Sequence, residues 1–423
     1  MLSTLRNAWK VPELRKKFLW TIFLVAIFRI GIHIPVPGID TGALSTLTES
    51  GGLLGFYNLI SGGAFTKASI LALSVSPYIN ASIIMQLLTI AVPSLEQLSK
   101  EGEEGRKKIQ SITRYLSIAI GCVLAFGTYT TVANMGAASG VNTIEKIIII
   151  LSLVVGSTFC MWLGDQITQR GFGNGVSILI FVNIISQLPT TAMSLYTLQT
   201  AGEISIVEII LFLVGVVALL ALTIFFSLAE RRVPIQYAGK AVGSKVMKGQ
   251  STHIPLSIIG SAVIAIIFAM SVMMFPSTIA AFFPGKGWAQ WITGSKYSIF
   301  NQSTWMYPVC YAVLTIFFTW FYTQITFKPD EMAENLHKSA GFVPGIRPGE
   351  ATEKYFEKLL TKVSIIGGIF AAFLAVIPIL VGNYISGVQF GGTSLLILIG
   401  VALDFSRQLD SQLVMRHYNG FLK

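Results

Sequence analysis

Apolar residues along this 423-residue chain gather in long runs that are separated by short polar segments. Ten runs have about the length that a helix needs to cross the roughly 30 Å hydrocarbon core of a bilayer. The last is the weakest, because it reaches full length only by including Asp404 and Arg407. The pattern predicts ten transmembrane helices, at about 18–35, 74–92, 115–133, 147–163, 176–190, 207–228, 254–275, 304–325, 363–381 and 392–415.

One apolar segment, residues 53–93, is too long for a single crossing, since a helix of its 41 residues would measure roughly 60 Å. Gly62, Gly63 and Lys67 interrupt its first half, whereas residues 79–92 run without a break. We expect a short broken helix that enters the membrane from outside, followed by a true crossing. Non-helical backbone at membrane depth is tolerated only inside protein or beside a water-filled cavity. The segment therefore predicts a cavity.

Composition agrees with a membrane protein, because 53% of the residues are hydrophobic and only 12% are charged. In soluble domains about a quarter of the residues are charged. The first run follows a basic start without a small-residue cleavage site, so we expect a retained helix rather than a signal peptide. The three cysteines fall inside predicted spans and the four histidines are scattered, so we expect no disulfide, metal site or cofactor.

The net charge of +10 is distributed unevenly along the chain. With ten spans and an inside N-terminus, 25 of the 30 lysines and arginines fall in cytosolic segments. Positive residues concentrate on the cytosolic side of membrane proteins, so the bias places both termini in the cytosol. Topology and contact with anionic lipid explain much of the excess. The cytosolic segments are 1–17, 93–114, 164–175, 229–252, 326–362 and 404–423.

Two of these cytosolic segments, 229–252 and 326–362, are long and charged. In the first, Val233 to Tyr237 has the pattern of a short strand. In the second, Pro329 to Lys338 and Pro348 to Leu360 have helical patterns that flank a Gly/Pro turn. We expect both loops to project beyond the lipid headgroups and to contact a partner.

The spans divide into two sets of five, and each fifth span follows a glycine-rich opening, Gly171-Phe-Gly-Asn-Gly and Phe390-Gly-Gly-Thr-Ser. The two similar segments are only five residues long. It indicates an N-terminal half of residues 1–200 and a C-terminal half of residues 201–423, related by pseudo-symmetry. Such halves place a transport pathway at their interface.

Few residues of the spans are suited to chemistry. No phosphate-binding loop is present, so we expect no nucleotide hydrolysis and no enzyme. No carboxylate lies at the centre of a span, which argues against an ion-coupled transporter. Arg29 lies roughly 16 Å into the first span, where it either faces other helices or snorkels outward, and we expect a structural role rather than a gating role. The pairs Ile79/Ile83 and Ile180/Ile184 each share a helix face, which by itself indicates only packing or lipid contact.

Seven segments, in order over nearly the whole chain, give it a close resemblance to the SecY family, the central subunits of bacterial protein-conducting channels. They include SGGAFTKASILAL and PYINASIIMQLL within 61–88, EEGRKKIQSITRY at 103–115, GFGNGVSI at 171–178, AERRVPIQYA at 229–238, GQSTHIPL at 249–256, GFVPGIRPG at 341–349 and GGTSLLI at 391–397.

The resemblance implies an all-α integral membrane protein, in which ten helices in two halves enclose an hourglass pore. The implied pore ring consists of Ile79, Ile83, Ile180, Ile184, Ile267 and Ile397. An apolar ring can block ions by dewetting, yet it offers a passing polypeptide no fixed binding site. A movable plug, about Leu53 to Ala68, is implied on the outer side of the ring, with Leu53, Leu54, Phe56, Asn58, Ser61, Gly62, Gly63 and Lys67 among its residues.

In this family a lateral gate opens between spans two and three on one side and spans seven and eight on the other. Gln86 is the implied polar contact on span two. Span seven departs from the family pattern, with Ala265 where a proline is common and Ile259 where an asparagine is often found. Because of this departure, the sequence does not predict whether this gate has the family's polar network and helix kink.

The cytosolic loops are implied to dock the translating ribosome or the SecA motor ATPase. Arginine suits both RNA phosphates and carboxylates, because its guanidinium binds them in a bidentate fork. The implied contacts are Arg347, then Arg231 and Arg232, then Lys240, Lys245 and Lys248 at the loop tip. The family also implies two small membrane subunits, SecE and SecG.

The hypothesis is therefore a non-enzymatic channel of the bacterial plasma membrane. It passes unfolded polypeptides across the membrane and releases apolar segments sideways into lipid, with energy from the ribosome or SecA. Two alternatives remain at this point. A secondary transporter of a small solute requires a polar midplane site, and a ribosome scaffold without a pore leaves the broken segment 53–93 unexplained.

Overall fold

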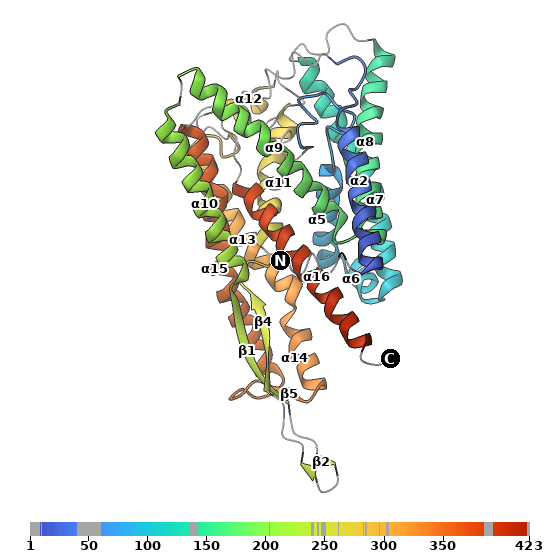
Figure 1. Ribbon diagram of the computed structural model, residues 1–423, viewed down its shortest axis with the longest axis vertical. Coiled ribbons are helices and arrows are strands. Elements are labelled where there is room, and N and C mark those ends of the chain that lie inside the picture. The colour runs from blue at the N-terminus through green and yellow to red at the C-terminus, as the bar shows by residue number, and fades with distance from the viewer. Residues whose placement is uncertain are drawn as a thin grey trace.

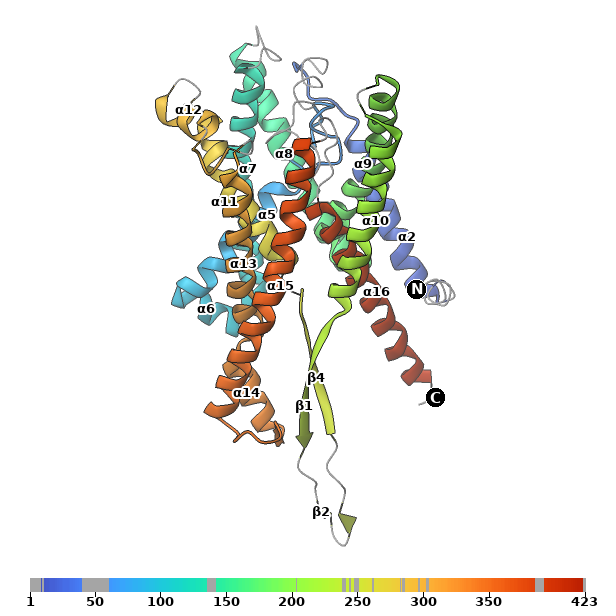
Figure 2. The ribbon, with the colours of Figure 1, turned by 90° about the vertical axis from the view of Figure 1, so that its left-hand side faces the viewer.

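The computed structural model is an elongated helical bundle with a narrow β-sheet that projects from one end (Figure 1). It describes residues 9, 11–39, 61–134, 142–202, 204–237, 241–242, 245–246, 251–260, 262–281, 283, 286–295, 297–301, 304–384 and 392–420. We call the end that carries the sheet the sheet end, and the opposite end the α12 end. Helix α2 begins and α16 ends toward the sheet end of the bundle (Figure 2).

A helix lies over each of the ten predicted spans. The helices are α2 (Pro12–Gly31), α5 (Ser76–Ala91), α6 (Pro93–Lys100), α7 (Glu103–Asn134), α8 (Thr143–Arg170), α9 (Gly175–Thr200), α10 (Ile206–Leu228), α11 (Ala262–Ala281), α12 (Gly287–Gly294), α13 (Met306–Phe327), α14 (Pro329–Lys338), α15 (Glu350–Tyr384) and α16 (Gly392–Gly420). Among the described residues, six helices are long and apolar enough to cross a membrane, or seven if α5 and α6, bent by 100°, form one broken span. The all-α membrane architecture is confirmed, and the count of ten spans stays a prediction.

The two cytosolic segments of the sequence form one small folded unit at the sheet end. Strands β1 (Glu230–Tyr237), β4 (Ser251–Ser257) and β5 (Gly341–Phe342) make an antiparallel sheet in the order β4-β1-β5. A separate hairpin pairs β2 (Ala241–Val242) with β3 (Lys245–Val246). The sheet covers a core of its own with α14 and the start of α15, built from Val233, Ile235, Leu256, Ala333, Leu336, Val343, Phe356 and Leu360.

Two boundaries differ from the sequence-based prediction. The seventh span, predicted from residue 254, begins at Ala262, because Ser251–Ser257 is a strand paired with β1. The apolar side chain of Leu256 packs in the sheet-end core instead of facing lipid. The helix predicted for residues 348–360 begins at Glu350 and continues without interruption to Tyr384.

Helices α13 and α15 pack closely along a stripe of threonines and glycines. Thr315, Thr319 and Thr323 each donate the side-chain hydroxyl to the backbone carbonyl four residues earlier, so their buried polar atoms are satisfied. On the facing helix, a Cβ added to Gly368 would lie 3.1 Å from Cα of Ile316. Small side chains at this contact let the helix backbones approach, which is how helices associate where water is absent.

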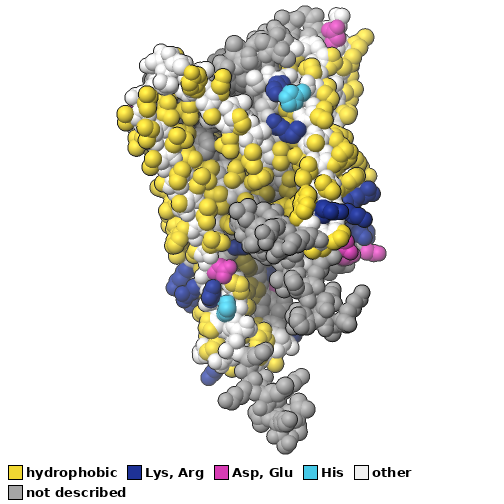
Figure 3. All heavy atoms as spheres, in the orientation of Figure 1, with side chains coloured by type: hydrophobic (Ala, Val, Ile, Leu, Met, Phe, Trp, Pro, Cys, Tyr) yellow, Lys and Arg dark blue, Asp and Glu magenta, His cyan; other side chains and the backbone are white. Residues whose placement is uncertain are grey.

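Hydrophobic side chains cover the visible surface of the helical part, and Lys and Arg appear mostly nearer the sheet end (Figure 3). Helix α10 is an extreme case, because its long apolar side chains are exposed along most of the helix, including Leu211 and Phe225 at 71% and 70%. In water such a surface would drive aggregation, whereas in a bilayer it is the expected lipid-facing or partner-facing surface.

Candidate functional site

The segment that precedes α5 is non-helical over nearly all of residues 61–75 and is buried inside the protein. Ala64, Phe65, Ala68 and residues 71–75 are among its buried positions. Gly62 and Gly63 have φ values of +68° and +86°, in the left-handed region that glycine adopts without strain. The predicted interruption therefore lies where the sequence indicated. Leu53, Leu54, Phe56 and Asn58 lie outside the described residues, and the predicted cavity stays a prediction.

Hydrogen bonds to the end of α2 fix the middle of this segment. The amide of Val36 donates to the carbonyl of Ala68 at 2.8 Å, and the amide of Ile70 donates to the carbonyl of Ile34 at 3.0 Å. The hydroxyl of Ser69 donates to the carbonyl of Gly31 at 3.0 Å. These partners satisfy backbone groups that a helix would have satisfied internally, which irregular backbone at membrane depth requires.

Arg29 is closer to the helix end than the sequence suggested. Because α2 ends at Gly31, Arg29 lies in the last turn, where a positive charge interacts favourably with the helix dipole. Its guanidinium Nη1 donates to Oγ of Ser186 on α9 at 2.9 Å. On the same helix α9, Nδ2 of Asn183 donates to Oγ of Ser74 at 3.4 Å. Of the two expected positions, the arginine therefore takes the one that faces another helix, α9.

Four of the six predicted ring isoleucines belong to one hydrophobic cluster. Ile180 and Ile184 of α9 are buried in it, and Ile79 of α5 and Ile397 of α16 pack against it. The same cluster contains Ala64, Leu71 and Val75 of the non-helical segment. Ile83 and Ile267 are half-buried and lie outside this cluster. The structure thus brings three helices and the segment 61–75 together, while the role of the six residues as a pore ring stays a prediction.

A seam separates the pair α5 and α7 from the pair α11 and α13. Each pair packs closely, and contacts across the seam between α7 and α11 are far fewer. A hydrogen bond crosses the seam from Oγ of Ser271 on α11 to Oδ1 of Asn80 on α5, at 3.3 Å. Gln86, the predicted polar contact, is exposed. Sequence reasoning missed Asn80, although a polar residue inside an otherwise apolar span was a usable signal.

The two departures from the family pattern on span seven lie inside the protein. Ile259 is 4% exposed and Ala265 is fully buried. Ile259 belongs to the core cluster of α11, α13 and α15. A proline does occur inside α11, at Pro276, about three turns beyond Ala265.

The predicted docking residues lie at the sheet end. Arg231, Arg232 and Arg347 are all exposed. In β1, Arg231 shares the strand face of the buried Val233, whereas Arg232 lies on the opposite face, because side chains alternate along a strand. Lys245 lies in β3, and Lys240 and Lys248 lie outside the described residues.

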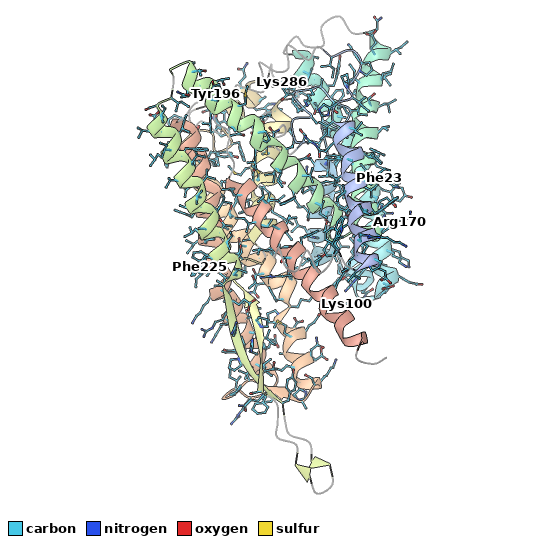
Figure 4. The ribbon with its side chains drawn as sticks, viewed as in Figure 1. Phe23, Lys100, Arg170, Tyr196, Phe225 and Lys286 are labelled. Atoms are coloured by element: carbon cyan, nitrogen blue, oxygen red, sulfur yellow. The ribbon has the colours of Figure 1, made fainter. Side chains whose placement is uncertain are left out.

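Charged residues elsewhere mark the two ends of the bundle. Lys100 and Arg170 lie on the half of the bundle nearer the sheet, and Lys286 lies at the α12 end (Figure 4). All three are exposed. Arg114 and Asp165 form an ion pair of 2.8 Å between α7 and α8, and Gln110 donates to the same carboxylate. These contacts hold the sheet-side ends of α7 and α8 together.

Residues 69–406 match the SecY family. Among curated relatives, the protein translocase subunit SecY of Rickettsia typhi is 40% identical over 419 residues, which are 97% of this chain and 96% of that protein. The protein translocase subunit SecY of Thermotoga maritima is 39% identical over 438 residues, 100% of this chain and 98% of that protein.

Solved structures have the same fold. One described as the structure of a protein conducting channel has a TM-score of 0.68 and 18% identity, with 97% of each chain covered. Sec61 in the canine ribosome-channel complex from the endoplasmic reticulum has a TM-score of 0.63 and 18% identity, again with 97% of each chain covered. The sequence and structural likenesses both extend over nearly the full length of the chain.

Proposed function

Because this chain belongs to the SecY family of protein translocase subunits, we propose that an unfolded polypeptide passes between its two halves through the cluster formed by α5, α9 and α16. The observation that carries this proposal is one hydrophobic cluster that joins Ile79, Ile180, Ile184 and Ile397 to the non-helical segment. An apolar constriction of this kind excludes ions by dewetting. It also accepts any side chain that passes, which suits a substrate without a fixed sequence.

The segment from about Leu53 to Ala68 acts as the plug of this channel. Its described part is irregular, buried and packed against the same cluster. Backbone hydrogen bonds at residues 68–70 join it to the chain at the end of α2, and the residues before them are able to move about this anchor without breaking a helix. Gly62 and Gly63 supply a flexible point in front of that anchor.

Apolar segments leave the channel sideways through the seam between α5 and α11. The Asn80–Ser271 hydrogen bond supports this role, because it joins neutral groups and breaks at low cost. The seam separates two closely packed pairs of helices that can move apart as units. The halves that move correspond to residues 1–200 and 201–423.

The channel lies in the bacterial plasma membrane with both termini in the cytosol. The start of α2 and the end of α16 lie on the side of the sheet, which supports a common side for both termini (Figure 2). Residues Arg232 and Arg347 then project from the sheet end into the cytosol. There they dock a ribosome or the SecA motor, and a structural relative is itself part of a ribosome-channel complex. SecE and SecG contact the exposed apolar faces of the bundle, and anionic lipid contacts the positive residues of the cytosolic segments.

A crosslinking experiment tests the pathway. A photo-crosslinking amino acid at Ile83, half-buried on the α5 face that carries Ile79, is expected to react with a secretory polypeptide stalled in the channel. The matched control is the same probe at Leu211, which is 71% exposed on α10 and is expected to react with lipid or a partner subunit. Crosslinks between the secretory polypeptide and the probe at Leu211, without crosslinks at Ile83, would contradict the proposed path. They would favour a scaffold or a transporter without a polypeptide pore.

A further inference from the structure

We propose that Arg29 is a positioning residue of the closed channel, which with Asn183 and Ser186 of α9 forms a polar seat for the plug at Gly62. The inference rests on the proposed role of residues 53–68 as the plug. It assigns a reason for a positive charge near the outer end of α2, which the apolar pattern of the span leaves unexplained.

The seat is built from two helices. The guanidinium Nη1 of Arg29 donates to Oγ of Ser186 at 2.9 Å, and that hydroxyl donates to the backbone carbonyl of Asn183 at 2.7 Å. Arg29 is half-buried and Asn183 is fully buried. A cation at this depth requires an acceptor that stays in place, and Ser186, held by its own hydrogen bond to the α9 backbone, supplies one.

Gly62 lies directly against this seat. It is buried, and a Cβ added to it would lie 2.5 Å from Oδ1 of Asn183 and 3.0 Å from Nη1 of Arg29. The backbone of the plug therefore touches both polar side chains without an intervening group. A Cβ at this position requires the side chain of Asn183 or Arg29 to shift, so the seat and the glycine fit each other.

A second contact holds the other end of the same stretch. His33 lies four residues after Arg29, just beyond the end of α2 at Gly31. Its Nδ1 lies 3.0 Å from the carbonyl of Arg29, so Nδ1 carries the hydrogen and Nε2 is an acceptor. Nε2 accepts from Nζ of Lys67 at 2.9 Å. The stretch 62–67 is thus fixed to the end of α2 at both of its ends.

This arrangement predicts what happens when the plug leaves. Opening separates Gly62 from Arg29 and Asn183 and breaks the contact between Lys67 and His33, while the bonds at residues 68–70 remain as a hinge. The seat therefore favours the closed state specifically. Its loss increases the open population instead of destroying the channel.

Two glycine variants provide a matched test. Gly62→Ala and Gly63→Ala both place alanine at a positive φ, +68° and +86°, so both variants strain the backbone. Only the first introduces a clash, because the nearest atom to a Cβ on Gly63 is Nε2 of Gln187 at 3.5 Å. In the purified complex in liposomes, we expect ion leak to rise about tenfold or more for Gly62→Ala and much less for Gly63→Ala.

The arginine is tested by Arg29→Gln and Arg29→Lys. We expect Arg29→Gln to raise the leak, and Arg29→Lys to restore the seal in part, because lysine keeps the charge without the planar fork. In cells, Arg29→Gln is also expected to export a reporter whose signal sequence is defective. Misfolding would lower export, so this gain of function separates release of the plug from damage to the fold.

Deletion of residues 55–65 distinguishes the two proposals. If the deletion leaks and Arg29→Gln and Gly62→Ala seal normally, the plug stands and the seat is overturned. If the deletion itself does not leak, the plug is overturned, and the seat with it. Combining Arg29→Gln with the deletion is expected to add no further leak, whereas an additive leak would show that Arg29 acts elsewhere.

Discussion

Ser271 of α11 donates a hydrogen bond to Oδ1 of Asn80 on α5, with 3.3 Å between the two oxygen atoms. The bond crosses the seam between the closely packed pair α5 and α7 and the closely packed pair α11 and α13. A neutral hydrogen bond contributes only about 0.5–1.5 kcal/mol net. The hydrogen bond across the seam is therefore weak.

Removing this bond is predicted to lower the hydrophobicity that a segment needs to enter the membrane. We expect Ser271→Ala to increase insertion of marginally apolar segments by about two- to tenfold, as follows from the free energy of one neutral bond. Insertion of a series of segments with graded leucine content measures the effect. The control is Ser277→Ala, because Oγ of Ser277 bonds to Phe300 within the same half. Equal insertion by both variants and the natural protein would contradict the role of Asn80 and Ser271.

Deletion of residues 55–65 is predicted to raise the ion conductance of the resting channel. The deletion removes Gly62 and Gly63 and most of the segment proposed to cover the isoleucine cluster. Conductance of liposomes that contain the purified complex measures the leak. Export of a substrate with a strong signal sequence, by the same variant, shows that the complex has assembled. Unchanged conductance in an assembled complex counts against the plug.

Arg347→Glu is predicted to stall secretion and leave insertion of the channel itself into the membrane intact. The side chain of Arg347 is exposed, and its backbone carbonyl accepts a hydrogen bond from the hydroxyl of Thr352 at 2.8 Å, so the loop keeps its shape. Reversing a charge that binds a partner bidentately is expected to weaken docking about tenfold or more. Lys358→Glu, an equal charge change at an exposed site on α15, is the control. Normal export by Arg347→Glu would overturn the assignment.

The two neighbouring arginines of β1 are predicted to differ. Arg232 projects from the face opposite the sheet-end core, whereas Arg231 shares the face of Val233. A partner that approaches the outer face of the sheet formed by β4, β1 and β5 contacts Arg232 and not Arg231. We expect Arg232→Glu to weaken binding of ribosomes or SecA to the purified complex several-fold more than Arg231→Glu does. Equal losses would indicate that both faces are covered.

The interruption at Gly62 and Gly63 was predictable because chain length and hydrophobic thickness are fixed quantities. An apolar stretch of 41 residues cannot cross once, and glycines mark where the backbone departs from a helix. The strand at Val233 to Tyr237 was predictable from its alternating pattern, and β1 confirms it. The identity of the side chains around Gly62 was not predictable, since Arg29 and Asn183 are distant from it in the sequence.

The run from residue 254 shows the opposite case. Ile254, Pro255 and Leu256 are apolar, and hydrophobicity alone cannot distinguish a strand that covers a small core from the start of a membrane helix. Pairing with β1 makes this segment a strand, and Leu256 packs in the sheet-end core outside the helical bundle. Asn80 was missed for a similar reason, since its partner Ser271 lies 191 residues away.

By itself the sequence determined the membrane class, the positions of the long helices and the break before α5, because backbone groups in a bilayer must be paired within the protein and a continuous apolar run of sufficient length pairs them as a helix. Its motifs determined the family. Only the tertiary structure decided which polar residues meet: Asn80 with Ser271 across the seam, and Gly62 with Arg29 and Asn183 at the seat. The reason is physical, since apolar patterning fixes which face of a helix is buried, whereas packing of distant helices fixes which polar groups lie within hydrogen-bonding distance.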